Sequence, residues 1–232
     1  MKVILSRKGF DSAYGGYPSP ILPGEEMVSL PIPFKDDAMR YSDLKIGGST
    51  YYELMKDLRP KILCQAKWLD LNKETRCHLD PDICRDSIER EPGWKSCFGQ
   101  IDAAQSHLER QRVGEDDLFL FFGWFRKTRY HNGKLEFDPN ERDLHALFGY
   151  LQIGEIEKVN PGFNLPKWMA YHPYTDRKRM SNKTNTIYIA RHDLIWNKSL
   201  PGAGRLKFND NLILTKKGLS RSRWDLPDCL RS

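Results

Sequence analysis

Residues 116–130, DDLFLFFGWFRKTRY, form an apolar, aromatic run that predicts a long β-strand. Because side chains alternate along a strand, Phe119 and Phe121 should lie on one side, and Phe122 and Trp124 on the other. So many aromatic residues within one short segment are typical of a protein core. We therefore expect this segment to lie at the centre of a sheet.

A second strand is predicted downstream, in LHALFGYLQIGEIEKV at residues 144–159. Between the two lies HNGK, whose Asn132-Gly133 pair is a strong hairpin signal. Gly149 and Gly154 interrupt the second strand and predict bends or bulges there. The centre of the fold is thus expected to be a long antiparallel pair.

Further strands are predicted before and after this pair in the sequence. Residues 185–194, NTIYIARHDL, read as a third strand, and residues 205–218 as a hairpin around Asn209-Asp210-Asn211. Near the start, residues 2–5 read as a short buried strand and residues 26–33 as an edge-like one. The prolines of this early region limit it to short extended pieces.

Two helices are predicted in the first half. Residues 51–58 place apolar side chains at near-helical spacing, with Ser49 or Thr50 as the N-cap and Pro60 at the end. Residues 99–113 read as the second helix. We predict a single α+β domain over residues 1–232. Its N-terminal region, residues 1–112, should be mixed; residues 113–219 should be β-rich and hold a curved sheet or small barrel; and residues 220–232 should form a tail.

The composition fits a folded and mildly basic protein. The chain has 232 residues, of which 39% are hydrophobic, with a formal charge of +6 and a pI near 9.0. This charge is compatible with a polyanionic partner, and equally with an ordinary solvated basic surface.

The cysteines and the apolar segments indicate a cytoplasmic protein. No run approaches the roughly 20 apolar residues that cross a bilayer, and no secretory signal is expected at the start. The cysteines lack the close pairs of a zinc site, so we expect reduced thiols and no metal. They are Cys64, Cys77, Cys84, Cys97 and Cys229.

The central strands resemble those of PUA-like domains, the group that contains the ASCH and EVE families. The resemblance rests on VGEDDLFLFFGWF at 113–125 and LFGYLQIGEIEKV at 147–159. It implies a small barrel in the second half, of a kind that reads or processes bases in nucleic acids.

A fuller resemblance is to the nucleotide-modification-associated domain family, third type. It rests on ILSRKGFDSAYGGYPSPI (4–21), HLDPD (78–82), FGQIDAAQSHL (98–108), DLFLFFGWFR (117–126), LHALFGYLQIGEI (144–156), AYHPY (170–174) and SRSRWDLP (220–227). This resemblance implies a place in a DNA- or nucleotide-modification system of bacteria or phages. It does not supply a reaction.

The loop after the first strand is the first candidate site. Its Ser6, Lys8 and Gly15-Gly16 suit a phosphate, because glycines let backbone N–H groups approach an anion and a lysine neutralises it. Asp11 is a candidate general base or nucleophile. The alternative is a tight turn in which Asp11 binds backbone amides and Arg7.

The alternating His78, Asp80 and Asp82 form the second candidate. In an extended segment they would share one side, as a hard metal or an acid–base pair requires. The alternative, which we favour, is a turn at Asp80-Pro81 and a helix cap at Asp82. No Ser- or Cys-centred hydrolase motif is present.

Base recognition is expected from Gln100, Trp124 and Tyr150. A glutamine amide pairs with a base edge, and an aromatic ring beside a glycine leaves room for a flat ligand. The alternatives are a solvated helix face for the glutamine and core packing for the rings.

Proton transfer and further phosphate contacts are expected in the second half. His172, beside Pro173, is the side chain best suited to exchange a proton near neutral pH. Arg191 would hold phosphate with Lys8, and the basic run 177–183 would contact a nucleic-acid backbone. A surface histidine and a solvated basic loop are the alternatives.

We therefore predict one basic, aromatic-lined pocket that binds a nucleotide or a flipped base, with DNA as the favoured partner and no cofactor identified. The protein would modify its ligand, as a transferase or hydrolase. The alternatives are a PUA-like reader without catalysis, or a structural component of a phage-defence or modification complex. The predicted catalytic residues are Asp11 and His172, and the predicted nucleotide-binding residues are Ser6, Lys8, Gly15, Gly16, Gln100, Trp124, Tyr150 and Arg191.

Overall fold

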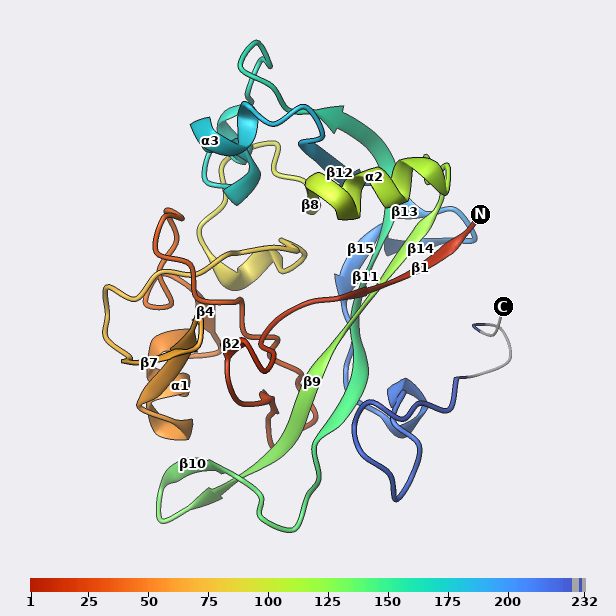
Figure 1. The fold of residues 1–232 in the computed structure, drawn as a ribbon. Coiled ribbons are helices and arrows are strands. Elements are labelled where there is room, and N and C mark those ends of the chain that lie inside the picture. The colour runs from red at the N-terminus through yellow and green to blue at the C-terminus, as the bar shows by residue number, and fades with distance from the viewer. Residues whose placement is uncertain (227–229, 231–232) are drawn as a thin grey trace.

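A mixed sheet lies at the centre of the protein (Figure 1). The computed structural model describes residues 1–226 and residue 230. Within these residues the sheet has eight strands, with a main path in the order β1-β9-β11-β12-β8. These strands are β1 (Val3–Arg7), β9 (Leu118–His131), β11 (Leu144–Lys158), β12 (Thr186–Ala190) and β8 (Cys97–Gln100), with β3 (Ser19–Ile21) and β10 (Lys134–Phe137) also paired to β9 and β15 (Ala203–Arg205) paired to β11.

The predicted long pair is confirmed as β9 and β11, which are antiparallel. Leu147 pairs with Phe122, but Gly149 pairs with the preceding Phe121, so the register shifts within β11. A second shift occurs at Gly154, in the pairing of β11 with β12. Both glycines therefore mark irregularities, as their positions predict. In contrast, β1 and β3 run parallel to β9, which makes the sheet mixed.

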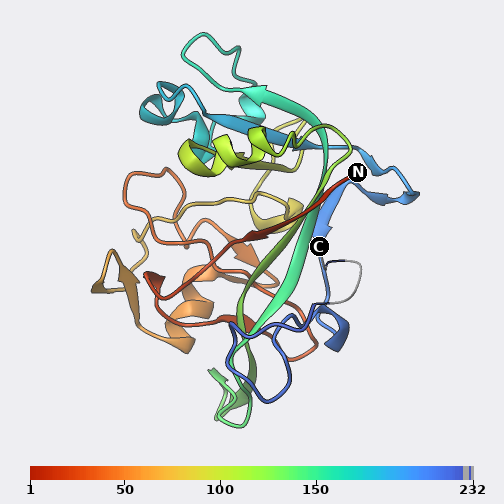
Figure 2. The same ribbon diagram turned by 45° about the vertical axis from the view of Figure 1, so that its right-hand side comes forward.

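The two faces of β9–β11 pack against different segments of the chain. One face carries Phe119 and Phe121, which belong to the main hydrophobic core with Phe98 of β8. The other face carries Phe122, which packs with Leu214 and Trp224 of the C-terminal segment. In Figures 1 and 2 the N-terminal third (red to orange) accordingly lies on one side of the central strands, and the C-terminal segment (blue) on the other.

The remaining elements are short. The helices are α1 (Tyr51–Leu58), α2 (Asp102–Arg110) and α3 (Arg177–Met180), and the 3₁₀ turns are η1 (Arg85–Ser87), η2 (Lys167–Met169), η3 (Pro173–Thr175) and η4 (Asp210–Leu212). Small sheets pair β2 (Tyr14–Gly15) with β6 (Lys61–Cys64) and β7 (Lys67–Asp70), β4 (Lys45–Ile46) with β5 (Ser49–Thr50), and β13 (Asp193–Leu194) with β14 (Asn197–Pro201). None of the helices in the described portion of the chain has the length and apolar character that a bilayer crossing needs.

Local expectations are met in several places and corrected in others. Thr50, rather than Ser49, caps α1, because its hydroxyl accepts from the Glu53 N–H in a capping box. Residues 26–33 form isolated bridges instead of a strand, since Pro31 and Pro33 have no N–H to donate. The hairpin predicted at 209–211 is also wrong: Asn209 caps the 3₁₀ turn η4 instead.

The described cysteines are free thiols: Cys64, Cys77, Cys84 and Cys97. Cys229 and the end of the predicted tail lie outside the described residues. No three His, Cys, Asp or Glu side chains gather as a metal site among the residues that the structure describes.

Candidate functional site

Asp80 is a fully buried carboxylate that joins three distant segments of the chain. Its Oδ2 lies 3.0 Å from Nζ of Lys8, the residue that follows β1. Its Oδ1 accepts the backbone N–H of Gly99, in β8, at 2.7 Å, and lies 3.5 Å from Nε2 of His172. We call these four residues the Asp80 centre.

The environment of Asp80 keeps it ionised. Burial alone would raise the pKa of this carboxyl group, but Lys8 and the His172 contact outweigh it and hold the pKa well below its usual range. His172 has no exposed side-chain surface, and its Nδ1 accepts the N–H of Tyr174. The other ring nitrogen, Nε2, therefore faces Asp80.

Close packing explains why β8 presents a glycine here. A Cβ on Gly99 would lie 2.1 Å from the ring of Tyr174, so no side chain fits. The ring of Phe98, on the preceding position, lies 4.2 Å from Nζ of Lys8. The Asp80 centre is thus enclosed by two aromatic rings, which strengthens its electrostatic interactions by excluding water.

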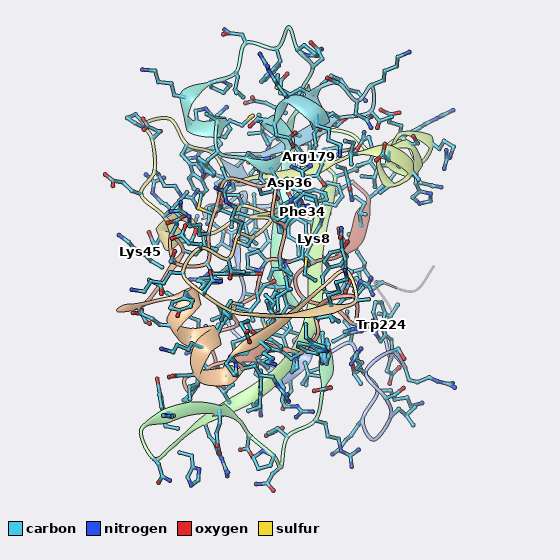
Figure 3. All side chains as sticks on the ribbon, turned by 60° about the vertical axis from the view of Figure 1, so that its left-hand side comes forward. Lys8, Phe34, Asp36, Lys45, Arg179 and Trp224 are labelled. Atoms are coloured by element: carbon cyan, nitrogen blue, oxygen red, sulfur yellow. The ribbon has the colours of Figure 1, made fainter. Side chains whose placement is uncertain are left out.

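A second group of paired charges lies beside the first. Asp37 is buried, and its two oxygens lie 2.6 Å from Nδ1 of His78 and 2.6 Å from Nη1 of Arg179. The Arg179 guanidinium stacks over Phe34 at 4.9 Å. Figure 3 shows Arg179, Phe34 and Lys8 one below another near the middle of the view. Arg179 therefore points inward, which corrects the expectation that the basic run 177–183 is a backbone-binding loop at this position.

A third buried carboxylate positions an aromatic side chain. Asp82 accepts hydrogen bonds from both terminal nitrogens of Arg90, at 2.7 and 2.8 Å, and from the hydroxyl of Tyr171 at 2.6 Å. It also accepts a hydrogen bond from Nε1 of Trp94 at 3.1 Å. The Arg90 guanidinium lies 4.2 Å from the centroid of the indole ring. Trp94 is consequently fixed from two directions.

His78, Asp80 and Asp82 thus have three separate partners: Asp37, Lys8 and Arg90. This corrects the expectation of a shared metal or acid–base side. The expected helix cap is also wrong, because Cys84 and not Asp82 precedes the 3₁₀ turn η1, although the chain does bend at Pro81. The two buried carboxylates, Asp80 and Asp82, each have a counter-charge of their own.

Trp94 contributes to the wall of an open cleft of about 870 Å³. The cleft lies between the segment before β8, the ends of β11 and β12, and the β13–β14 hairpin. Small residues of the sheet, including Ala190 and Ala203, contribute to its lining. Its charged lining residues are Arg85, Lys95, Arg191 and Lys198, with Glu155, Asp193 and the neighbouring His192.

The position of Arg191 in this cleft is set by its backbone. A Cβ on Gly202 would lie 2.1 Å from the Arg191 carbonyl oxygen, and one on Gly154 would lie 2.9 Å from the Arg191 nitrogen. Arg191 N–H also donates to the carbonyl of Gln152. The side chain forms an ion pair with Asp116. Arg191 is thus a half-buried cation on a rigid support.

Of the predicted site residues, Lys8 and His172 come together, at the Asp80 centre. Asp11 instead takes the role that the alternative interpretation gives it. Its Oδ1 accepts the N–H groups of Ala13 and Tyr14 at 2.7 and 2.8 Å, and its Oδ2 lies 3.4 Å from Arg7. The structure therefore favours a turn at Asp11.

The two glycines of the opening loop serve close packing. A Cβ on Gly15 would lie 2.0 Å from the ring of Phe10, and one on Gly16 would lie 2.7 Å from the ring of Trp68. Both glycines have positive φ, which other residues rarely adopt. Their packing partners are thus side chains of this chain itself.

The sheet separates the remaining residues. Ser6 pairs with Phe121, so Ser6 and Lys8 point to the main core face. Trp124 lies three positions after Phe121 in β9, so its side chain points to the opposite face. Tyr150 pairs with Leu120, the neighbour of Phe121, and therefore lies on that opposite face as well. The single pocket expected around Lys8, Trp124 and Tyr150 is therefore corrected, because a sheet lies between these groups.

Trp124 and Tyr150, on this opposite face, have partners within the fold, and so does Gln100. Trp124 stacks under Arg221 at 3.8 Å, and the Tyr150 hydroxyl donates to the carbonyl of Pro201. Gln100, at the end of β8, pairs with Thr186. Tyr150 thus approaches the edge of the cleft through Pro201.

Sequence reasoning missed Asp37, Trp94 and most of the cleft. Nothing in residues 91–95, EPGWK, distinguishes Trp94 from a surface tryptophan. The adjacent His192-Asp193 pair, at the end of the predicted strand 185–194, was a usable signal, since a histidine beside a carboxylate is a typical proton-transfer pair.

Comparison with known proteins places the chain in a family. The family model for nucleotide modification associated domain 3 matches residues 2–232. The chain belongs to this family. Neither the curated proteins nor the solved structures gave a match.

In this nucleotide modification associated domain 3 protein, four of the stretches on which the sequence resemblance rested meet at one carboxylate. Lys8, Asp80, Gly99 and His172 come from residues 4–21, 78–82, 98–108 and 170–174. The Asp80 centre therefore brings together distant segments of the family sequence.

Proposed function

We propose that this protein binds a nucleotide, or a single base of DNA, in the cleft that contains Arg191 and Trp94, and modifies it. The observation that carries the proposal is the cleft itself: about 870 Å³, with four Lys or Arg side chains against two carboxylates among its described lining residues. Family membership indicates an association with nucleotide modification and supports the same ligand class.

The size and the charge of the cleft suit a nucleotide. Ligand pockets usually enclose about 300–1,000 Å³, so the volume is sufficient for a base, a sugar and a phosphate. Arginine guanidinium groups bind phosphate through paired hydrogen bonds. Arg191 would hold the phosphate, with Lys95 and Lys198 nearby on the same lining.

Trp94 would contact the base. Its indole is already fixed by Asp82 and Arg90, so little side-chain entropy remains to be lost on binding. In this proposal the Asp80 centre, which holds Lys8 and His172, positions β8, the strand that follows Trp94, and does not touch the ligand.

His192 would move the proton in the modification step. Its Nδ1 lies 2.8 Å from Oδ1 of Asp193, so the carboxylate orients the ring and leaves Nε2 to accept a proton. Both residues line the cleft. His172 and Asp11, the residues expected for this role, are hydrogen-bonded within the fold.

A binding experiment tests the proposal. The purified protein would be titrated with the four deoxynucleoside monophosphates and with a short single-stranded DNA. Arg191→Gln should weaken binding at least about tenfold, because a hydrogen bond to a charged group contributes about 1.5–3 kcal/mol. Arg129→Gln is the matched control, since Arg129 is also half-buried and paired, with Glu136, but lies outside the cleft. Equal affinities for both variants and the wild type would refute the proposal.

The second candidate function is a reader that binds without modifying. It is favoured by the structural hydrogen bonds of Asp11 and the burial of His172. Mass spectra of nucleosides recovered after incubation separate the two functions. Modification predicts a new mass that is lost in His192→Gln while binding persists, whereas a reader leaves every nucleoside unchanged.

A further inference from the structure

The β13–β14 hairpin exposes a group of large apolar side chains. Ile195, Trp196 and Leu200 have 45%, 53% and 45% of their surface accessible. Ile195 and Trp196 form the turn between the two strands. Figure 2 shows this hairpin, in light blue, projecting from the body of the protein. Neighbouring apolar side chains that are exposed at one place on the surface often mark an interaction site.

The base of the hairpin is well anchored. Leu194 is buried, and the N–H of Ile195 donates to Oε1 of the fully buried Gln152 at 2.8 Å. At the other end, Gly202 packs on the Arg191 carbonyl and donates its N–H to the carbonyl of His192. The tip therefore projects on a fixed support, as a binding element requires.

The same hairpin forms one wall of the cleft. Asp193, Lys198 and Pro201 line the cleft, while Ile195 and Trp196 form the turn at the other end of the hairpin. Lys198 lies two residues from Trp196. An aromatic tip thus stands beside the cations that would hold phosphate.

We propose that this hairpin tip stacks on the bases of a DNA strand, and that a neighbouring nucleotide of the same strand occupies the cleft. The inference rests on the proposed function and deepens it, because it makes the substrate a base within DNA rather than a free nucleotide. The cleft alone would bind a free nucleotide, without any contact from the hairpin tip. Apolar side chains that insert beside bases, next to phosphate-binding cations, are a recurrent means of displacing a base from its stack.

Charge favours DNA over a protein partner at this surface. The tip is flanked by Lys198, and Arg85, Lys95 and Arg191 line the adjoining cleft. The whole chain carries a formal charge of +6. A polyanion with exposed rings complements both the excess of positive charge in the cleft lining and the apolar tip, whereas a hydrophobic protein surface would complement the tip alone.

The test compares Trp196→Ala with Trp68→Ala. Trp68 is the matched control because it has the same exposed fraction, 53%, and also lies on a hairpin, in strand β7 of the β6–β7 pair. The ligands are a fluorescein-labelled 12-nucleotide single-stranded DNA, its RNA counterpart and a deoxynucleoside monophosphate. Trp196→Ala should weaken DNA binding about 5- to 150-fold, which corresponds to about 1–3 kcal/mol for one stacked base. It should leave monophosphate binding unchanged, and Trp68→Ala should match the wild type.

Several outcomes would overturn the inference. Unchanged DNA affinity in Trp196→Ala would do so, as would tighter binding of the RNA than of the DNA by the wild type. A Trp196→Ala change that alters only the oligomeric state, measured by light scattering, would assign the tip to a second copy of the chain. The proposed function fails separately, through Arg191→Gln, so the two results are distinguishable. Circular dichroism of each variant checks that the fold is retained.

Discussion

Nζ of Lys8 lies 3.0 Å from Oδ2 of Asp80, 72 positions further along the chain. The lysine side chain is only 14% exposed and the carboxylate is fully buried. This pair connects the end of β1 to the segment that leads into β8 and the cleft. Arg7, one residue earlier, makes an exposed pair with Asp11.

Lys8→Ala should lower the free energy of unfolding by about 3–5 kcal/mol, because it leaves a buried carboxylate without its cation. Arg7→Ala should lower it by at most about 1 kcal/mol, as for other exposed ion pairs. Urea denaturation followed by tryptophan fluorescence measures both. Equal effects of the two substitutions would contradict the role assigned to the Asp80 centre.

Gly99→Ala should destabilise the protein by about 1–3 kcal/mol, since the added methyl group would meet the Tyr174 ring at 2.1 Å. The ring contacts His172 and His78, so its displacement disturbs both charge groups. Gly114→Ala is the control, because nothing lies within 4 Å of its Cβ position. We expect a change below about 0.5 kcal/mol there. Similar urea midpoints for the two variants would show that the packing at Gly99 is less restrictive than the contacts indicate.

His145 should make stability depend on pH. Burial, with Arg221 and Arg7 nearby, lowers the pKa of this histidine from 6.5 to about 4. Between those values the unfolded chain binds a proton that the folded protein does not, so the free energy of unfolding falls as the pH decreases from about 6.5 to 4.

Nδ1 of His145 accepts a hydrogen bond from Nε1 of Trp224 at 3.0 Å, so protonation of the ring also removes this bond to the C-terminal segment. His145→Gln should reduce the pH dependence in this range, whereas His107→Gln, on the exposed side of α2, should retain it. Denaturation series at pH 7, 5.5 and 4 provide the measurement. An identical slope in His145→Gln and the wild type would assign the pH dependence to other groups.

The salt dependence of DNA binding should separate charge from stacking. Arg191→Gln should reduce the slope of log affinity against log salt by about 0.7, the value for one phosphate contact on a single strand. Trp196→Ala should lower affinity at every salt concentration with the slope unchanged, since stacking releases no counterions. A reduced slope in Trp196→Ala would indicate that the hairpin acts through charge.

Much of the local structure could be predicted from the sequence alone. Alternation and ring density predicted the central strands at 116–130 and 144–159, which the structure has at 118–131 and 144–158, and Gly149 and Gly154 marked their irregularities. The cap and the apolar spacing specified α1. These features depend on neighbours within a few residues, so a pattern read along the chain contains them.

Which functional groups meet depends on the tertiary fold. The sequence pointed to Lys8 and His172, but their common partner Asp80 became evident only when β1, β8 and η3 were in place. The register of β1 against β9 put Lys8 and Trp124 on opposite faces, and the β13–β14 hairpin brought Arg191 to the cleft with Trp94. Buried charges choose partners by proximity across the fold, and that proximity depends on register and packing, which no local pattern encodes.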